Sequence, residues 1–316
     1  MDESRGRIVT EVFRNLKIRG FRVSDPDLTG SICFDMMARR DNEKYFLKVL
    51  YNVDTIRKDA ASELITLAKV TGSAAVVIGE RTGAGKLEHG LVYYRHTIPI
   101  MSPETFVDYV DGEKPYVFSG PGGFYVSLDG EKMRSAREEE GFSIGYVSGK
   151  IGTSRRSISL YESGTAATVE VFLRLCDLLE RDLRRSIDLL NVVRSIEPPH
   201  MLNSIDDTLL RTISNKIVGS GYTMNIMRKS PFDAMAGNGT ETLIMGLLEL
   251  IGRDYERASA MRNIADILED DLLVVSRNHT EKTQISGCPV VNVKELVDYC
   301  DRGELGSLVE RKKRGL

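Results

Sequence analysis

The sequence has few residues that bind metals and no long apolar segment. It contains four histidines and four cysteines, the latter without a CxxC pair or a histidine at ligand spacing: Cys33, Cys176, Cys288 and Cys300. A structural zinc site needs four clustered ligands, so none is predicted. No apolar run approaches the roughly 18 residues of a membrane helix, and the charged N-terminus is unlike a signal peptide. These absences predict a soluble, cytoplasmic, reduced protein.

The chain also lacks an excess of positive charge. Its 43 lysines and arginines are balanced by 46 aspartates and glutamates, for a formal net charge of −3. Any nucleic-acid-binding surface must therefore be a local basic patch. The hydrophobic share of 41% is ordinary for a globular protein, and 316 residues suffice for two or three domains.

Periodicity divides the chain into an α/β region, a helical region and a second α/β region. Residues 1–125 alternate amphipathic helices with short β-rich runs, and residues 197–316 repeat that order. The middle, residues 126–196, is expected to be almost purely helical as far as Asn191, with GPGG (120–123) as a flexible joint before it. The sequence EPPH (197–200) breaks the chain after it, because proline cannot continue a helix. The predicted fold class is α/β plus all-α.

The two α/β regions show signs of an internal duplication. Phe34-Asp35 and Phe232-Asp233 fall at matching points, each two residues before an alanine-centred end of the predicted strand, and FVDYVDGE resembles LVDYCDRGE near the last helix. A duplication explains these coincidences better than two unrelated domains. The alternative is chance, since this order of helices and strands is common.

The helical region contains the stop and start signals of a helix-turn-helix. Asp129 is a predicted helix cap, Ser143 opens a second helix, Gly152 makes a tight turn, and Ser154 caps a third helix that Gly164 ends. Two short helices joined by a turn around glycine form this DNA-binding unit. Val147, Ile151, Ile158 and Tyr161 are expected to lock the helices together, with Ser148 at their closest approach.

The predicted reading helix starts with two arginines. Arg155 and Arg156 lie at its N-terminus, where arginine can bind guanine O6 and N7 through two hydrogen bonds. Ser159 lies one turn further along the same face. Lys150, Arg137 and the helix N-terminus near Ser143 are the candidates for phosphate contacts. The alternative is a helical linker with an arginine pair on a solvated face.

Residues 129–180 resemble the phage Cro/repressor type of helix-turn-helix, called XRE. The resemblance lies in Arg134 and Arg137, Gly141-Phe142-Ser143, Gly152-Thr153-Ser154, Ile158-Ser159 and Tyr161-Glu162-Ser163-Gly164. It implies base-reading roles for Arg155, Arg156 and Ser159 and backbone contacts for Ser143 and Lys150. Thr153 and Ser154 complete the predicted DNA-binding set. The sequence departs from the family at Val147-Ser148, where Leu-Ala is usual, and at Gly149, where a helix former is expected.

The N-terminal region resembles a restriction-endonuclease core that has lost part of its site. Such nucleases hold Mg²⁺ with an aspartate on one strand and (Glu/Asp)-x-Lys on the next. Asp35 and Lys48 are present, but Phe46 replaces the second acid, and in the second copy Gly246 replaces the lysine. Glu11 or Glu63 could substitute only from neighbouring helices. The sequence favours an internal ion pair between Asp35 and Lys48 over catalysis.

Other signals are weak. The loop RTGAGKLEHG (81–90) lacks the spacing of a P-loop, and His96 and His279 have no nucleophile at motif spacing. The basic tail VERKKRGL (309–316) is predicted to be disordered.

The chain as a whole resembles the archaeal family of helix-turn-helix transcriptional regulatory proteins, which implies a sequence-specific regulator that binds double-stranded DNA. We predict a homodimer, since palindromic half-sites need two reading heads, with a small-molecule effector possible. No catalytic residue, cofactor or metal is predicted. The alternatives are a DNA-targeted restriction-type nuclease and an antitoxin-like interaction module.

Overall fold

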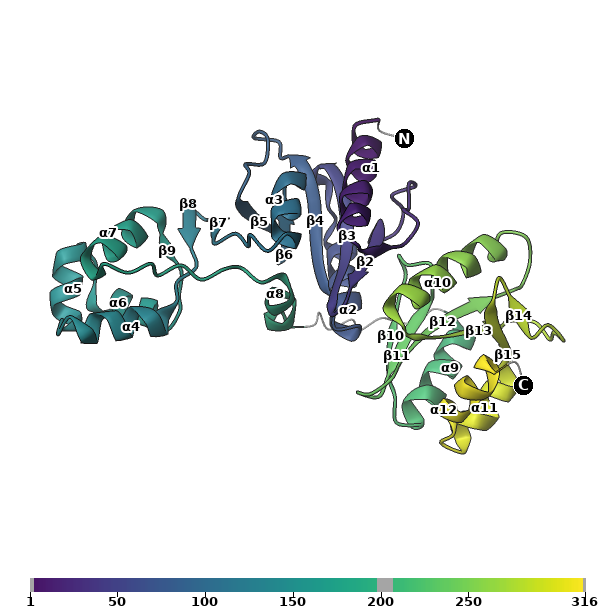
Figure 1. The fold of residues 1–316 in the computed structure, drawn as a ribbon. Coiled ribbons are helices and arrows are strands. Elements are labelled where there is room, and N and C mark those ends of the chain that lie inside the picture. The colour runs from purple at the N-terminus through teal and green to yellow at the C-terminus, as the bar shows by residue number, and fades with distance from the viewer. Residues whose placement is uncertain (1–2, 198–206, 315–316) are drawn as a thin grey trace. The chain divides into compact units, whose positions relative to one another are not determined.

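The computed structural model describes residues 3–197 and 207–314 (Figure 1). Its helices are α1 Glu3–Ile18, α2 Lys58–Val70, α3 Pro103–Val110, α4 Gly130–Glu139, α5 Ile144–Ile151, α6 Arg155–Glu162, α7 Val169–Leu179, α8 Leu189–Ser195, α9 Thr208–Gly219, α10 Asp254–Leu268, α11 Val293–Asp301 and α12 Leu305–Lys313. Its strands are β1 Arg22–Val23, β2 Met36–Arg40, β3 Glu43–Asn52, β4 Ala74–Arg81, β5 Leu91–Arg95, β6 Ile98–Met101, β7 Val117–Gly120, β8 Gly123–Val126, β9 Ala167–Thr168, β10 Thr223–Ile226, β11 Ala234–Gly237, β12 Thr242–Leu248, β13 Asp271–Ser276, β14 Gln284–Ile285 and β15 Cys288–Asn292.

The strands form two mixed sheets. The first has the order β1-β2-β3-β4-β6-β5-β7-β8-β9, and the second has the order β10-β11-β12-β13-β15-β14. Parallel neighbours such as β12 and β13 are joined through a helix, here α10, as parallel pairing requires. The chain is therefore mixed α/β outside its helix-turn-helix, as the sequence predicts.

Two compact units are distinguished by their internal contacts. One comprises Met1–Val49, Ile56–Ala75 and Val193–Leu316, and the other comprises Leu50–Thr55 and Val76–Val192. These units do not test the predicted domain boundaries near residues 125 and 196, which remain predictions. Most of the predicted chain break at EPPH (197–200) lies outside the described residues.

Helix α1 is amphipathic and lies alongside β3 (Figure 1). Ile8, Val12 and Leu16 are buried at a spacing of four residues, which places them on one stripe. The next helix follows a 3₁₀ turn. Residues Val53–Thr55 form this turn, and α2 starts at Lys58 without a side-chain cap.

In the second sheet, α10 covers one face while α9, α11 and α12 cover the other (Figure 1). The basic tail was predicted to be disordered, and this prediction is wrong through Arg314. Helix α12 buries Leu305, Leu308 and Val309 in the core. The Lys312 ammonium forms an ion pair with Glu295 at 3.2 Å, so this basic residue of the tail takes part in the folded domain.

The region expected to be purely helical contains strands. GPGG, interpreted as a flexible joint, is the turn of the antiparallel β7–β8 hairpin, with Gly122 at φ +82°. Strand β9, which precedes α7, pairs with β8 at the edge of the first sheet. All four cysteines are free thiols; Cys33 is buried, whereas Cys176 is partly exposed.

Two glycines of the helical region provide a matched test of packing. A Cβ added at Gly130, the first residue of α4, would lie 2.5 Å from the Glu162 carbonyl oxygen, whereas one added at Gly149 would meet nothing within 4 Å. We expect Gly130→Ala to destabilise the helical region by about 1–3 kcal/mol because backbone atoms must move. Gly149→Ala should stabilise it by about 1 kcal/mol through helix propensity.

Hydrogen exchange of peptides from residues 126–192 measures both effects, because it reports local opening within a multidomain chain. Equal protection in the two variants would contradict the close approach of α4 and α6.

Candidate nucleic-acid interface

Serine caps and one left-handed glycine set the geometry of the helix-turn-helix. The Ser143 hydroxyl accepts a hydrogen bond from the Tyr146 amide at 3.1 Å, and the Ser154 hydroxyl accepts one from the Ser157 amide at 3.0 Å. Gly152 ends α5 at φ +78°, which glycine adopts without steric cost. The turn between α5 and α6 is therefore specified by the residues that the sequence singled out.

Buried side chains hold these helices together. Val147, Ile151 and Ile158 are all at most 2% exposed, and Tyr161 is half-buried beside them. They belong to a core with residues of α4, α7 and β8. The Ser148 hydroxyl donates to the Gly145 carbonyl within α5, so this buried small residue has its polar group satisfied.

Arg137 does not face solvent, so the prediction that it contacts phosphate is wrong. Its side chain is 11% exposed and makes two hydrogen bonds to Glu162, one from Nη2 to Oε2 at 3.2 Å and one from Nε to Oε1. A further Nη1 hydrogen bond reaches the Phe142 carbonyl at 3.0 Å. The hydrogen bonding to Glu162 raises the pKa of Arg137 above its ordinary value. The Arg137–Glu162 pair therefore links α4 to the end of α6.

Sequence reasoning missed the role of Glu162. In the sequence, Glu162 stands out only as part of the run Tyr-Glu-Ser-Gly, although its carboxylate is 3% exposed in the structure. Its spacing of four residues from the buried Ile158 was an available signal, because residues i and i+4 share a helix face.

The predicted DNA-binding residues gather at the start of α6 and around α5. Six of the seven are exposed and Thr153 is partly buried; the exposed ones are Ser143, Lys150, Ser154, Arg155, Arg156 and Ser159. No carboxylate in the described part of the chain lies within 4.0 Å of the guanidinium of Arg155 or Arg156. Arg155 lies over α5, since a Cβ at Gly145 would be 3.1 Å from its Nε. Two exposed cations thus stand at one helix N-terminus.

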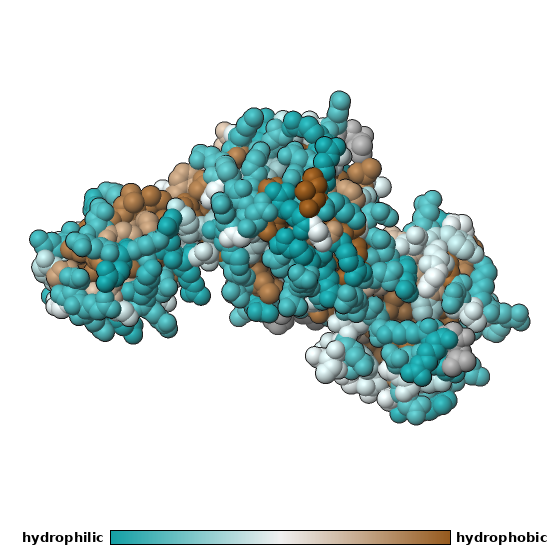
Figure 2. Space-filling model, viewed as in Figure 1, coloured by the Kyte–Doolittle hydropathy of each residue, from teal (hydrophilic) through white to brown (hydrophobic). Residues whose placement is uncertain are grey.

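The space-filling view shows a mostly hydrophilic surface on the face drawn, with hydrophobic side chains appearing in places over the helical region (Figure 2). The exposed basic residues of α5 and α6 are Lys150, Arg155 and Arg156, on a chain with a formal net charge of −3.

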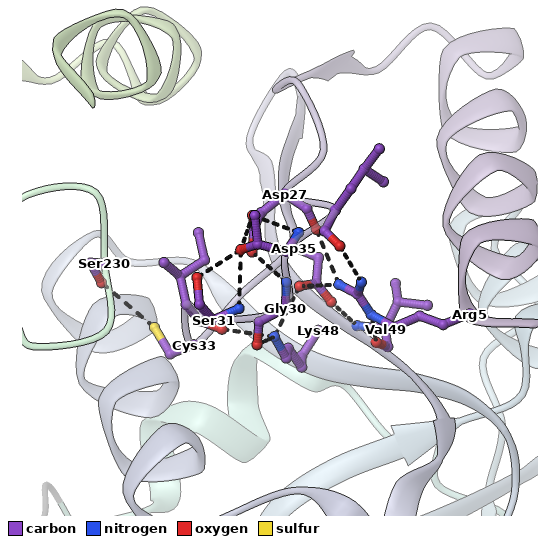
Figure 3. Close-up of polar contacts among 12 residues, drawn as sticks. Arg5, Asp27, Gly30, Ser31, Cys33, Asp35, Lys48, Val49 and Ser230 are labelled. Atoms are coloured by element: carbon purple, nitrogen blue, oxygen red, sulfur yellow. Dashed lines mark hydrogen bonds and ion pairs between the residues drawn. The ribbon is translucent and has the colours of Figure 1, made fainter. Parts of the chain in front are cut away.

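The nuclease-like site of the first sheet is filled by internal cations. Asp35 is 1% exposed. Its Oδ1 lies 2.9 Å from Lys48 Nζ and 2.8 Å from Arg5 Nη2, and its Oδ2 accepts the Val49 amide at 2.6 Å (Figure 3). Burial raises the pKa of the Asp35 carboxyl, and the Lys48 and Arg5 cations and the Val49 amide oppose that rise. The ion pair predicted between Asp35 and Lys48 is present.

The acids that could have replaced the missing ligand are not available. Phe46 is fully buried at the position of the second acid, and Glu11 is exposed on α1. Glu63 is buried, but it accepts hydrogen bonds from the amides of Arg228 and Lys229 at 3.0 and 2.7 Å. Residues 3–197 and 207–314 contain no group of three or more acidic, histidine or cysteine side chains that could hold a metal ion. The residues around Asp35 therefore do not fit the Mg²⁺ that a nuclease of this type uses.

The second sheet repeats the backbone pattern of this site without its lysine. Asp233 Oδ2 accepts a hydrogen bond from the Leu247 amide at 2.7 Å, as Asp35 Oδ2 accepts one from the Val49 amide. The β2–β3 and β11–β12 hairpins have the same register, and each residue of the second hairpin lies 198 positions after its equivalent in the first. Gly246 stands where Lys48 does. A Cβ there would lie 2.4 Å from the Met261 methyl carbon, so the place of the lysine is filled by that side chain.

Comparisons with known proteins identify two domains in this chain. A model of the PD-(D/E)XK superfamily domain matches residues 5–115, and a helix-turn-helix model matches residues 133–185. No solved structure matches. The structure and these matches define a helix-turn-helix protein with a PD-(D/E)XK-like domain at its N-terminus.

Relatives match along nearly the whole chain. A protein of Picrophilus torridus named "Putative HTH-type transcriptional regulatory protein" is 42% identical over 305 residues, which cover 96% of this chain and 97% of the relative. Proteins of the same designation from Thermoplasma volcanium and Methanocaldococcus jannaschii are 40% and 32% identical, over 99% and 94% of this chain and 100% and 94% of their own. The chain belongs to this archaeal family of HTH-type transcriptional regulatory proteins.

Among the described helices, none has the length and apolar character that crossing a bilayer demands.

The Arg137–Glu162 pair can be tested against an exposed pair in the same region. We expect Arg137→Ala to cost about 3–5 kcal/mol, because it leaves a buried carboxylate with an incomplete set of partners. Arg181→Ala removes an exposed pair with Glu139 and should cost at most about 1 kcal/mol. Hydrogen exchange of α4 and α6 measures both; equal losses would show that the buried pair does not hold the helices.

Proposed function

We propose that this regulator binds double-stranded DNA sequence-specifically and reads the major groove with α6. The observation that carries the proposal is the exposed pair Arg155 and Arg156 at the N-terminus of a helix whose other face is locked by buried contacts. In a helix-turn-helix, the N-terminal residues of the second helix face the base edges. Ser159, one turn further along, completes the proposed reading face.

Phosphate contacts are proposed for the residues that flank this helix. Ser143 and Lys150 lie at the two ends of α5, and Thr153 and Ser154 form the turn before α6. The hydroxyl, ammonium and helix N-terminal amide groups of this set are suited to phosphate oxygens. These contacts fix position on the duplex, whereas the arginines supply sequence preference.

The flanking α/β domains are proposed to be duplicated, inactive nuclease-like scaffolds. The matching Asp35 and Asp233 hydrogen bonds support the duplication, and the internal cations at Asp35 support the lack of metal-dependent chemistry. We further propose that these domains pair two chains into a homodimer, so that two reading heads meet two half-sites. A small-molecule effector stays an open prediction.

The arginine pair gives the first test of this function. Arg155→Ala combined with Arg156→Ala should weaken specific binding by about 2–6 kcal/mol, at about 1–3 kcal/mol for each bidentate contact. The fold should be unchanged because both side chains are exposed. Titrations against a selected duplex and a scrambled duplex at one salt concentration measure the effect.

A matched control comes from Lys150→Ala, which removes one proposed phosphate contact. It should weaken binding to both duplexes about equally and reduce the salt slope by about one. Equal loss on both duplexes for the double arginine variant would mean that these arginines contact phosphate only.

Nuclease activity is tested separately. The protein incubated with plasmid DNA and Mg²⁺ or Mn²⁺ should leave it uncut, because Asp35 already binds two cations and an amide. Cleavage that disappears in Asp35→Ala would contradict the scaffold assignment and favour the restriction-type alternative.

A further inference from the structure

The exposed face of α6 contains an apolar residue that the proposed reading set does not use. Leu160 is 44% exposed, whereas Ile158 and Glu162 on the opposite side of the same helix are at most 5% exposed. Single exposed leucines are common on protein surfaces, but this one lies on the exposed face of the proposed reading helix, beside residues proposed to contact bases.

Helical geometry places Leu160 next to Arg156. At about 100° per residue, the exposed residues follow one another around α6 in the order Arg155, Ser159, Arg156 and Leu160 across an arc of about 140°. Arg156 and Leu160, at positions i and i+4, are about 40° apart and one turn apart along the axis. A duplex that meets Arg156 therefore also meets Leu160.

The chemistry of the side chain selects one feature of the major groove. Leucine has no hydrogen-bond donor or acceptor, so it cannot read the polar edges of bases. The 5-methyl group of thymine is the apolar feature that the major groove presents, and it distinguishes A·T pairs from the others. We propose that Leu160 packs against a thymine methyl group next to the base read by Arg156 and thereby selects an A·T pair at that position.

This inference rests on the proposed function, because it requires α6 to lie in the major groove. Its occupant is the same duplex, since the leucine continues the face formed by Arg155, Ser159 and Arg156. The helical region offers a matched control in Leu173, which is 54% exposed on α7. Loss of an exposed leucine as such can thus be separated from loss of a DNA contact.

The test deletes the two contacting groups separately and together. A duplex selected from random sequence by the full chain is prepared with thymine or with deoxyuridine at each position in turn, and both forms are titrated with the wild-type protein, Leu160→Ala and Leu173→Ala. At one position, removing the methyl should weaken wild-type binding about 4-fold, the factor for one buried methyl group. The same change should alter Leu160→Ala binding less than about 1.5-fold, and Leu173→Ala should behave as the wild type.

The outcomes separate this inference from the function on which it depends. If no duplex is selected at all, the proposed function fails. If a duplex is selected and Arg155 and Arg156 contribute to it, but Leu160→Ala keeps the full wild-type sensitivity to every methyl group, the leucine contact is wrong. A change in oligomeric state for Leu160→Ala, without methyl coupling, would likewise overturn the inference and assign the leucine to a protein interface.

Discussion

The buried pair between Arg137 and Glu162 is the interaction on which the helix-turn-helix depends. Its two hydrogen bonds join α4 to the last turn of α6, and a third, from Arg137 to the Phe142 carbonyl, fixes the loop that leads into α5. Breaking a buried pair costs far more than breaking an exposed one, because the remaining charge stays desolvated. The orientation of α6, the proposed reading helix, is thus set by groups on its buried side.

Because the inner face of α6 is buried, its exposed residues form one continuous arc, which is the proposed recognition surface. One part of that arc is charged and the other is apolar. Arg155 and Arg156 are exposed cations without acidic partners in the described chain, and Leu160 is the exposed apolar residue at the other end of the arc. The flanking sheets contribute differently. Their aspartates, Asp35 and Asp233, bind backbone amides and cations such as Arg5 and Arg257 inside the fold, which supports the proposal that they are structural.

Sequence reasoning succeeded where one local rule decides the structure. The caps Ser143 and Ser154 and the turn at Gly152 follow from backbone preferences of single residues, and all three are present as predicted. It was less successful where distant residues decide. The role of Arg137 depends on the carboxylate of Glu162, 25 residues away, so the predicted phosphate contact was wrong. Helix α12 is stabilised by buried apolar residues and by acids such as Glu295, so the predicted disorder of the tail was also wrong. Short strands such as β7 and β8 were missed because they are defined by their pairing.

The central claim is that two copies of α6 read paired half-sites in the major groove. Selection of bound duplexes from random DNA by the full-length protein tests it most directly. The account predicts a palindrome whose half-sites are centred about one helical turn apart, or a multiple of it, with guanines at the positions of Arg155 and Arg156. Enrichment of no sequence above the starting pool, with binding that depends on salt alone, would contradict it.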